Sequence, residues 1–110
     1  MKHRTKRDAL NVNVRVREPA GSAPFGHLID LSPGGFSVSG QGAPVSADIH
    51  TVELVLPWPM HGIELVPLEV ERRWLDYTDT GRWHAGYQII HCPDEVVLAL
   101  EHLAVSFADE

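Results

Sequence analysis

The sequence predicts an all-β domain with one C-terminal helix, arranged as a small six-stranded antiparallel barrel. Short segments that alternate apolar and polar side chains follow one another from residue 10 to residue 91. The links between them are brief and rich in Gly, Pro, Ser and Asp, as antiparallel hairpins require. Only the last segment has the apolar spacing of a helix. Because no long helix separates the strands, a parallel α/β fold is disfavoured.

The first half of the chain predicts three strands and a tight hairpin. Residues 10–18 alternate strictly, which indicates a strand with one buried face. Turn-forming residues 19–24 lead to a second strand through residues 25–29. The SPGG sequence at residues 32–35 predicts a sharp reversal, because proline presets φ and paired glycines accept positive φ. A third strand follows, and residues 40–47 then form a loop.

The second half predicts three more strands. Residues 49–56 alternate as a strand, which the PWPMHG sequence at residues 57–62 should end. Residues 63–75 read as a long strand, in which Pro67 indicates an edge position or a bulge. Residues 82–91 form the last strand. These strands complete the barrel.

One amphipathic helix is expected at about residues 93–107, where it would plug or flank the barrel. Pro93 lies near its first turn, and Asp94 and Glu95 favour the positive end of the helix dipole. Its apolar positions are Val96, Leu100, Leu103 and Phe107.

The tryptophans are assigned to two environments. Trp74 and Trp83 lie in the middle of predicted strands, so core packing is expected for both. Trp58 lies between two prolines in a predicted loop. An exposed tryptophan there would suit docking to another protein, although loop tryptophans also cap barrels.

Length and composition indicate one domain: a barrel at residues 9–110 that follows a flexible basic arm at residues 1–8. No apolar run is long enough for a membrane span, so no membrane insertion is expected, and no signal peptide is recognisable. The single cysteine, Cys92, cannot form an internal disulfide. These features predict a cytoplasmic protein.

The charge is unevenly distributed. The net charge is -6, yet six of the nine Lys and Arg residues lie within the first seventeen positions. From Glu18 onward, three cations face fourteen carboxylates, which gives -11. Such a body repels a long polyanion and argues against nucleic-acid binding, although strand order alone also fits an OB-like barrel. The basic arm could still hold a small phosphate ligand, because the nearest charges dominate the local field.

The strongest motif is IDLSPGGFSV at residues 29–38, with Asp30, Ser32 and Gly35 in a D-x-S-x-x-G arrangement. Here the sequence resembles the bacterial PilZ family, in which a [D/N]-x-S-x-x-G turn and an upstream R-x-x-x-R segment hold cyclic di-GMP outside a six-stranded barrel. The order of the strands, the later VERRW and RWHAGYQI segments and the terminal helix extend the resemblance over nearly the whole chain. It implies a PilZ-type fold.

The motif residues suit a nucleotide ligand. The Asp30 carboxylate can accept the N1 and N2 hydrogen bonds of a guanine edge. Ser32 offers a hydroxyl to a phosphate or to the turn itself. Gly34 and Gly35 let the backbone approach a ligand, and Gly35 can adopt positive φ. The alternative is that Asp30 and Ser32 simply hydrogen-bond their own hairpin.

The arginine half of the implied site is irregular in residues 2–8, KHRTKRD. If Arg7 takes the second arginine position, His3 takes the first; if Arg4 takes the first, Asp8 takes the second. We favour Arg7 as the retained arginine, with His3 and Arg4 as further ligand contacts. Loss of one charged bidentate contact weakens binding by about 1.5 to 3 kcal/mol. An ordinary solvated terminus is the alternative for this segment.

Two functional hypotheses follow. In the first, the chain is a cyclic di-GMP receptor or adaptor that alters its contact with an unidentified effector protein when the ligand binds. In the second, it is a PilZ-like protein-interaction adaptor with weak or no nucleotide binding. No catalytic constellation predicts an enzyme, and the seven histidines lack the spacing of a metal site, so no metal or other cofactor is expected.

Overall fold

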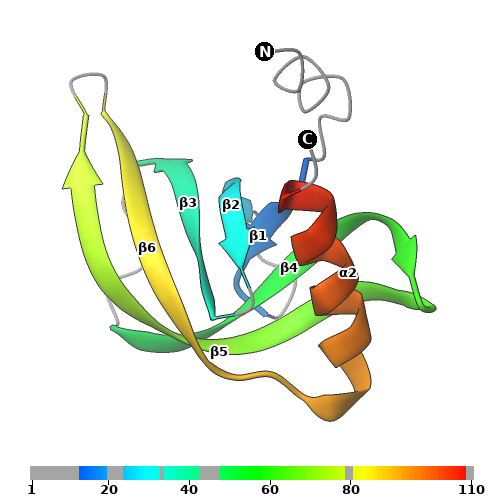
Figure 1. The fold of residues 1–110 in the computed structure, drawn as a ribbon. Helices are drawn as coiled ribbons and strands as arrows, with labels where there is room; N and C mark the ends of the chain where they lie inside the picture. The colour runs from blue at the N-terminus through cyan, green and yellow to red at the C-terminus, as the bar shows by residue number, and fades with distance from the viewer. Residues whose placement is uncertain (1–12, 20–23, 33, 43–47, 79–80, 109–110) are drawn as a thin grey trace.

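The computed structural model describes residues 13–19, 24–32, 34–42, 48–78 and 81–108 (Figure 1). The predicted first strand is therefore described only from residue 13, and the predicted arm lies outside the described residues. The strands are β1 (Arg15–Arg17), β2 (Pro24–Ser32), β3 (Gly35–Gln41), β4 (Ile49–Met60), β5 (Ile63–Tyr77) and β6 (Arg82–His91). A 3-10 turn, η1 (Asp94–Val96), leads into helix α2 (Val97–Ala108).

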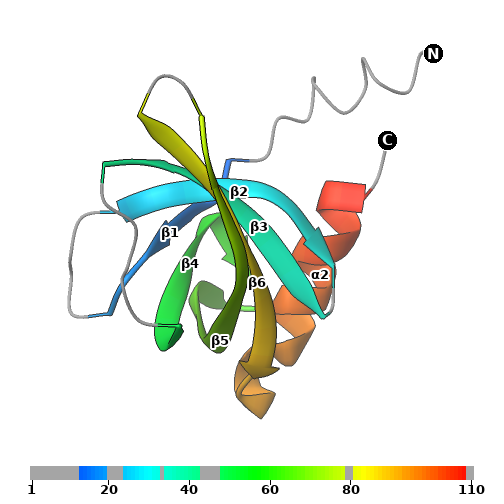
Figure 2. The same ribbon diagram turned by 90° about the vertical axis from the view of Figure 1, so that its left-hand side faces the viewer.

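The strands close into one antiparallel barrel in the order β1-β2-β3-β6-β5-β4 (Figure 2). The short strand β1 closes it, because Arg15 lies opposite His27 of β2 and opposite Val55 of β4. The described part of the chain thus has the predicted fold class, a six-stranded antiparallel barrel with one C-terminal helix. Closure leaves the ligand-accessible surface on the outside of the sheet and at the barrel ends.

Alternating side chains fill the interior. Val14 and Val16 are completely buried and Arg15 between them is exposed, as the alternation predicts. The predicted inward face of β4 is also buried. The core includes Leu28, Val38, Val52, Leu54, Leu56, Val66, Leu68, Val70, Trp83 and Ala85. Trp83 is 0% exposed, so core packing is confirmed for this tryptophan.

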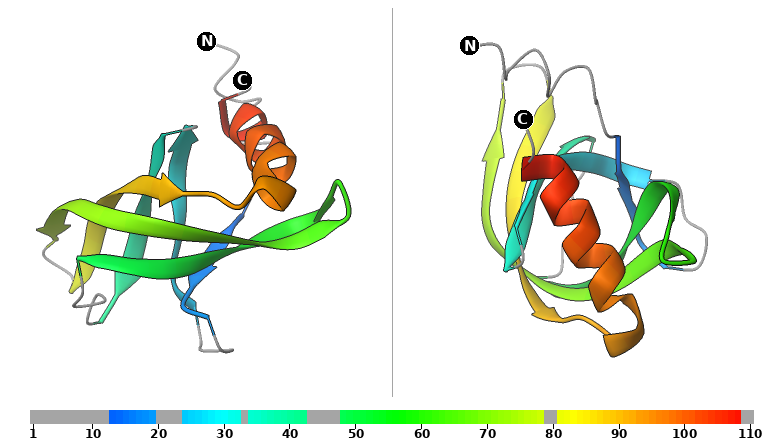
Figure 3. Two further views of the ribbon diagram at one scale, coloured as in Figure 1. Left: turned by 90° about the horizontal axis from the view of Figure 1, so that it is seen from below. Right: turned by 45° about the vertical axis from the view of Figure 1, so that its right-hand side comes forward.

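Helix α2 packs against β2, β4 and β5 and so flanks the barrel (Figure 3). Three of its four predicted apolar anchors, Val96, Leu100 and Leu103, are buried. The side chain of the fourth, Phe107, lies outside the described residues. No helix in the described part of the chain is long and apolar enough to cross a membrane.

Two local predictions about β4 and β5 have different outcomes. The prediction that residues 57–62 end the strand is wrong, because β4 continues to Met60 and the turn is made by His61 and Gly62 alone. Both turn residues have positive φ, 53° and 77°, which matches a tight two-residue hairpin. Pro67 does lie in an edge-like position: it pairs with β4, whereas the β6 ladder begins only at Glu69.

A half-buried histidine packs against Tyr87 in the barrel. Both ring nitrogens of His50, on β4, are buried and have no hydrogen-bond partner within the described residues. The ring stands edge-on to that of Tyr87, with 5.6 Å between the centroids. Burial lowers the pKa of His50 below its ordinary value of 6.5. Folding therefore favours the neutral form of this side chain.

The stability of the fold should depend on this histidine. Its pKa is lower in the folded chain, so the unfolded chain binds the proton more tightly, and the free energy of unfolding should fall as the pH drops below about 6.5. Denaturant unfolding over a range of pH measures this loss. In the His50→Leu variant the loss should be smaller. An identical pH dependence in the variant and the wild type would contradict the assignment to His50.

Candidate functional site

A β-bulge in β2 places Asp30 on the outer face of the barrel. Leu28 pairs with Val38 of β3 and Asp30 pairs with Ser37, so Ile29 is one extra residue in β2. Without it, strict alternation would turn Asp30 inward after Leu28. With it, Ile29 and Asp30 both face solvent, and Leu31 returns to the core.

The hairpin after Asp30 is fixed by local hydrogen bonds. The Ser32 hydroxyl donates to the Gly35 carbonyl oxygen at 3.2 Å, and these two residues form the last pair of β2 and β3. The Ile89 N–H of β6 donates to the Gly34 carbonyl oxygen at 3.0 Å. Ser32 therefore stabilises its own turn, as the alternative interpretation expects. Asp30 does not, because no described residue donates a hydrogen bond to its carboxylate.

Gly35 is needed for a different reason from the one that the sequence suggested. Positive φ is adopted by Gly42, Gly62 and Gly81, and not by Gly35, so that part of the prediction is wrong. A Cβ on Gly35 would lie 2.4 Å from the carbonyl oxygen of Tyr87. The missing side chain instead allows the turn to pack directly against the backbone of β6.

A second bulge places Trp74 outside the barrel. Arg72 pairs with Tyr87 and Trp74 pairs with Gly86, which makes Arg73 the extra residue in β5. The core position predicted for Trp74 is therefore wrong: the residue is 47% exposed. Its indole lies over Gly86, where a Cβ would lie 2.1 Å from Nε1.

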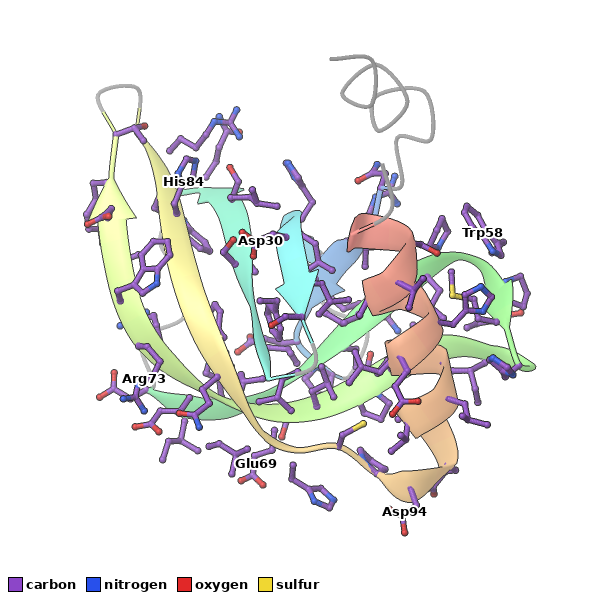
Figure 4. All side chains as sticks on the ribbon, in the orientation of Figure 1. Asp30, Trp58, Glu69, Arg73, His84 and Asp94 are labelled. Atoms are coloured by element: carbon purple, nitrogen blue, oxygen red, sulfur yellow. The ribbon has the colours of Figure 1, made fainter. Side chains whose placement is uncertain are left out.

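The two bulges and the hairpin turn together form a pocket of about 290 Å³. It is lined by Asp30, Ser32, Gly35, Phe36, Ser37, Arg73, Trp74, Gly86 and Tyr87. Figure 4 shows Asp30 on β2 and Arg73 on β5, with β3 and β6 between these strands. The pocket thus offers, on one outer face, an exposed indole, a guanidinium and a carboxylate that has no partner among the described residues.

Arg73 is held in place within this pocket. One of its Nη atoms donates to the Gln88 Oε1 atom at 2.8 Å, and the same atom lies 3.5 Å from the Glu71 carboxylate. The side chain remains more than half exposed. The guanidinium is therefore accessible to an anionic group of a ligand.

The structure brings together three of the seven site residues expected from the sequence: Asp30, Ser32 and Gly35. Gly34 is exposed at the turn and does not line the pocket. The three residues expected in the N-terminal segment, His3, Arg4 and Arg7, lie outside the described residues.

Sequence reasoning missed the contribution of β5 and β6. Arg73, Trp74 and Gly86 line the pocket but were not expected there. The signal was available in residues 70–75, VERRWL, where apolar positions 70 and 75 are an odd number of residues apart. Strict alternation cannot place both on the inner face, so this spacing indicates a bulge.

The segment just before β1 lies beside β2, the strand that carries Asp30. The Leu28 N–H of β2 donates to the Val14 carbonyl oxygen at 2.9 Å, which fixes Val14 beside the strand that carries Asp30. Arg7 and Asn13 are six positions apart, so the chain between them spans at most about 20 Å. A contact between Arg7 and a ligand in the pocket is compatible with this reach.

No model of a known protein family matches the sequence, and no curated protein matches it. Eight chains among the solved structures resemble this one, including the following three. The inhibitor of motility MotI/DgrA of Bacillus subtilis gives a TM-score of 0.59 at 12% identity, over 86% of this chain and 45% of that one. The PilZ domain of YcgR from Escherichia coli, described with c-di-GMP, gives 0.58 at 12% identity, over 88% and 82%.

The third structure, the PlzA protein of Borreliella burgdorferi in complex with c-di-GMP, gives a TM-score of 0.55 at 13% identity, over 90% of this chain and 46% of that one. The chain spans about half the length of MotI/DgrA and PlzA. These likenesses show that the chain has a PilZ-like fold, as the resemblance in the sequence implied.

The two turn glycines should respond differently to the same substitution. Gly35→Ala should lower the free energy of unfolding by about 1 to 3 kcal/mol, because its Cβ collides with backbone that cannot rotate away. Gly34→Ala is the matched control, since a Cβ there has no neighbour within 4 Å. Urea unfolding measures both. Equal losses would mean that packing against β6 does not explain Gly35.

Proposed function

We propose that the chain is a cytoplasmic receptor or adaptor that binds cyclic di-GMP in the pocket beside Asp30. The observation that carries the proposal is the Asp30 carboxylate, which has no partner among the described residues and shares an exposed pocket with the Trp74 indole. The PilZ-like fold supports it, because two of the similar structures are described with c-di-GMP. The chemistry of the pocket then assigns each residue a part.

Asp30 and Trp74 would recognise the base. A carboxylate accepts hydrogen bonds and donates none, so it pairs with the adjacent N1 and N2 donors of guanine. Base stacking on an aromatic side chain contributes about 1 to 3 kcal/mol per base. The half-exposed Trp74 indole offers such a surface. Gly35 and Gly86 keep the sheet beneath the ligand free of side chains.

Cations would hold the phosphates. Arg73 contributes a guanidinium within the pocket, and Arg7 would contribute a second from the N-terminal segment, with His3 and Arg4 as further contacts. A guanidinium matches two phosphate oxygens at once. In this proposal, ligand binding brings residues 1–8 against the barrel. The change in surface would then alter the contact with an effector protein.

Calorimetric titration with cyclic di-GMP tests the role of Asp30. Asp30→Asn should weaken binding about ten- to a hundredfold, through loss of a charge-assisted hydrogen bond. The direction of the change in affinity is diagnostic. If Asp30 did not contact the ligand, removal of a negative charge from this acidic chain should strengthen the binding of an anionic ligand. Asp76→Asn, which alters an exposed carboxylate of β5 outside the pocket, should not weaken binding. Equal weakening in both variants would remove Asp30 from the site.

The same titration with Arg7→Ala tests the N-terminal segment, and a marked loss of affinity is expected. Titration of the wild-type chain with cyclic di-GMP decides between the two functional hypotheses. Measurable binding supports the receptor. No binding at high micromolar cyclic di-GMP would contradict it and would favour an adaptor that interacts with proteins without the nucleotide.

Trp74 should contribute to cyclic di-GMP affinity by stacking its indole ring on a base. Trp74→Ala should weaken cyclic di-GMP binding by about fivefold to a hundredfold, which corresponds to the loss of one stacked base. Trp74→Phe keeps an aromatic surface and should recover part of that loss. Titration of both variants, with circular dichroism to verify the fold, gives the comparison. If alanine and phenylalanine lower the affinity equally, stacking is not the source of the effect.

A further inference from the structure

A second pocket, of about 390 Å³, lies on the outer face at the other end of β3 from Gly35. It is lined by Asn13, Arg15, Gly26, His27, Ser39, Gly40, Gln41 and Arg82. Among the described residues, it shares no lining residue with the pocket of Asp30, and none of its lining residues is a carboxylate. Figure 4 shows His84, which lies opposite Ser39 on β6, near this end of the barrel.

The register of the strands explains how the pocket collects positive charge. Arg15, His27 and Ser39 lie opposite one another on β1, β2 and β3. Gln41, two residues after Ser39 on the same face, lies opposite Arg82 of β6. The two arginines therefore approach the pocket from strands on either side of β2 and β3.

The arginines of this pocket differ from the other described arginines in their carboxylate partners. Of the five arginines in the described ranges, Arg17 pairs with Glu53, Arg72 with Asp48 and Arg73 with Glu71. The other two, Arg15 and Arg82, have no carboxylate partner among the described residues, and both line this pocket. Along the row through His27 and Ser39, the first carboxylate is Asp76, two strands beyond Ser39.

Two like charges that share a pocket repel each other unless an anion lies between them. Guanidinium groups bind phosphate with two hydrogen bonds each. The Ser39 hydroxyl and the side-chain amides of Asn13 and Gln41 add neutral donors of the kind that also contact phosphate. The volume falls within the range of small-molecule pockets, so it accommodates more than a lone phosphate ion.

We propose that this pocket binds the phosphate group of a small phosphorylated metabolite between Arg15 and Arg82. The site is separate from the proposed cyclic di-GMP site. A ligand here would offset the repulsion between the two arginines and would link β1, which closes the barrel, to β6.

Nuclear magnetic resonance titration of the whole chain tests the proposal, with ribose 5-phosphate and inorganic phosphate as probes. Sodium chloride at matched ionic strength and unphosphorylated ribose are the controls. The amide signals of Gly26, Ser39, Gly40 and Gln41 should shift with both phosphate probes and with neither control. Shifts with chloride alone, or shifts confined to other surfaces, would overturn the site. Shifts with inorganic phosphate but not with the sugar phosphate would overturn the metabolite as its ligand.

Three variants separate this pocket from general charge effects. Arg15→Gln and Arg82→Gln should each weaken the binding of ribose 5-phosphate about tenfold or more. Arg17→Gln removes the same charge from the same strand but lies outside the pocket, so it should retain the affinity. Equal weakening in all three variants would contradict the proposal.

A calorimetric comparison keeps the two sites distinguishable. Asp30→Asn should leave the binding of ribose 5-phosphate unchanged, and Arg15→Gln should leave the affinity for cyclic di-GMP unchanged. Failure of cyclic di-GMP to bind would contradict the proposed function and not this pocket. If Arg15→Gln lost affinity for both ribose 5-phosphate and cyclic di-GMP, the two ligands would share one site, which would overturn the inference.

Discussion

Two β-bulges determine what this barrel presents to solvent. A strand with strict alternation commits every second residue to the core, so Asp30 and Trp74 would each point inward from β2 and β5. One extra residue in each strand, Ile29 and Arg73, reverses that direction. The interior is filled by apolar side chains on both sides of the bulges. The polar and aromatic groups of the proposed nucleotide site are therefore available on the outside without a cavity in the core.

The outer sheet between the bulges is unusually free of large side chains. Gly35 lies against the backbone of β6, and Gly86 lies beneath the Trp74 indole. Ser37 of β3 lies between them in the register, opposite Gly86. The same strand β3 continues toward Ser39 and the second pocket, which Arg15 and Arg82 line. One face of the barrel thus carries two chemically different pockets, one with a carboxylate and an indole, the other with two arginines that lack a carboxylate partner among the described residues.

Local alternation and turn chemistry were sufficient to predict the barrel. Val14, Val16 and Trp83 are buried where the pattern placed them, and β2 and β3 pair as the predicted hairpin, although without positive φ at Gly35. The core prediction for Trp74 is wrong because it assumes strict alternation through β5, although the odd spacing of Val70 and Leu75 indicates a bulge. The closeness of β5 to the motif on β2 and β3 is likewise set by barrel closure, which no local pattern records.

The central claim is that the bulges at Ile29 and Arg73 build one nucleotide site from β2, β3, β5 and β6. The most direct test is the measurement of intermolecular nuclear Overhauser effects between cyclic di-GMP and the protein. The account predicts contacts from guanine and ribose protons to the Trp74 indole and to the backbone protons of Gly35 and Gly86. Contacts to helix α2 or to Trp58, with none to Trp74, would contradict it.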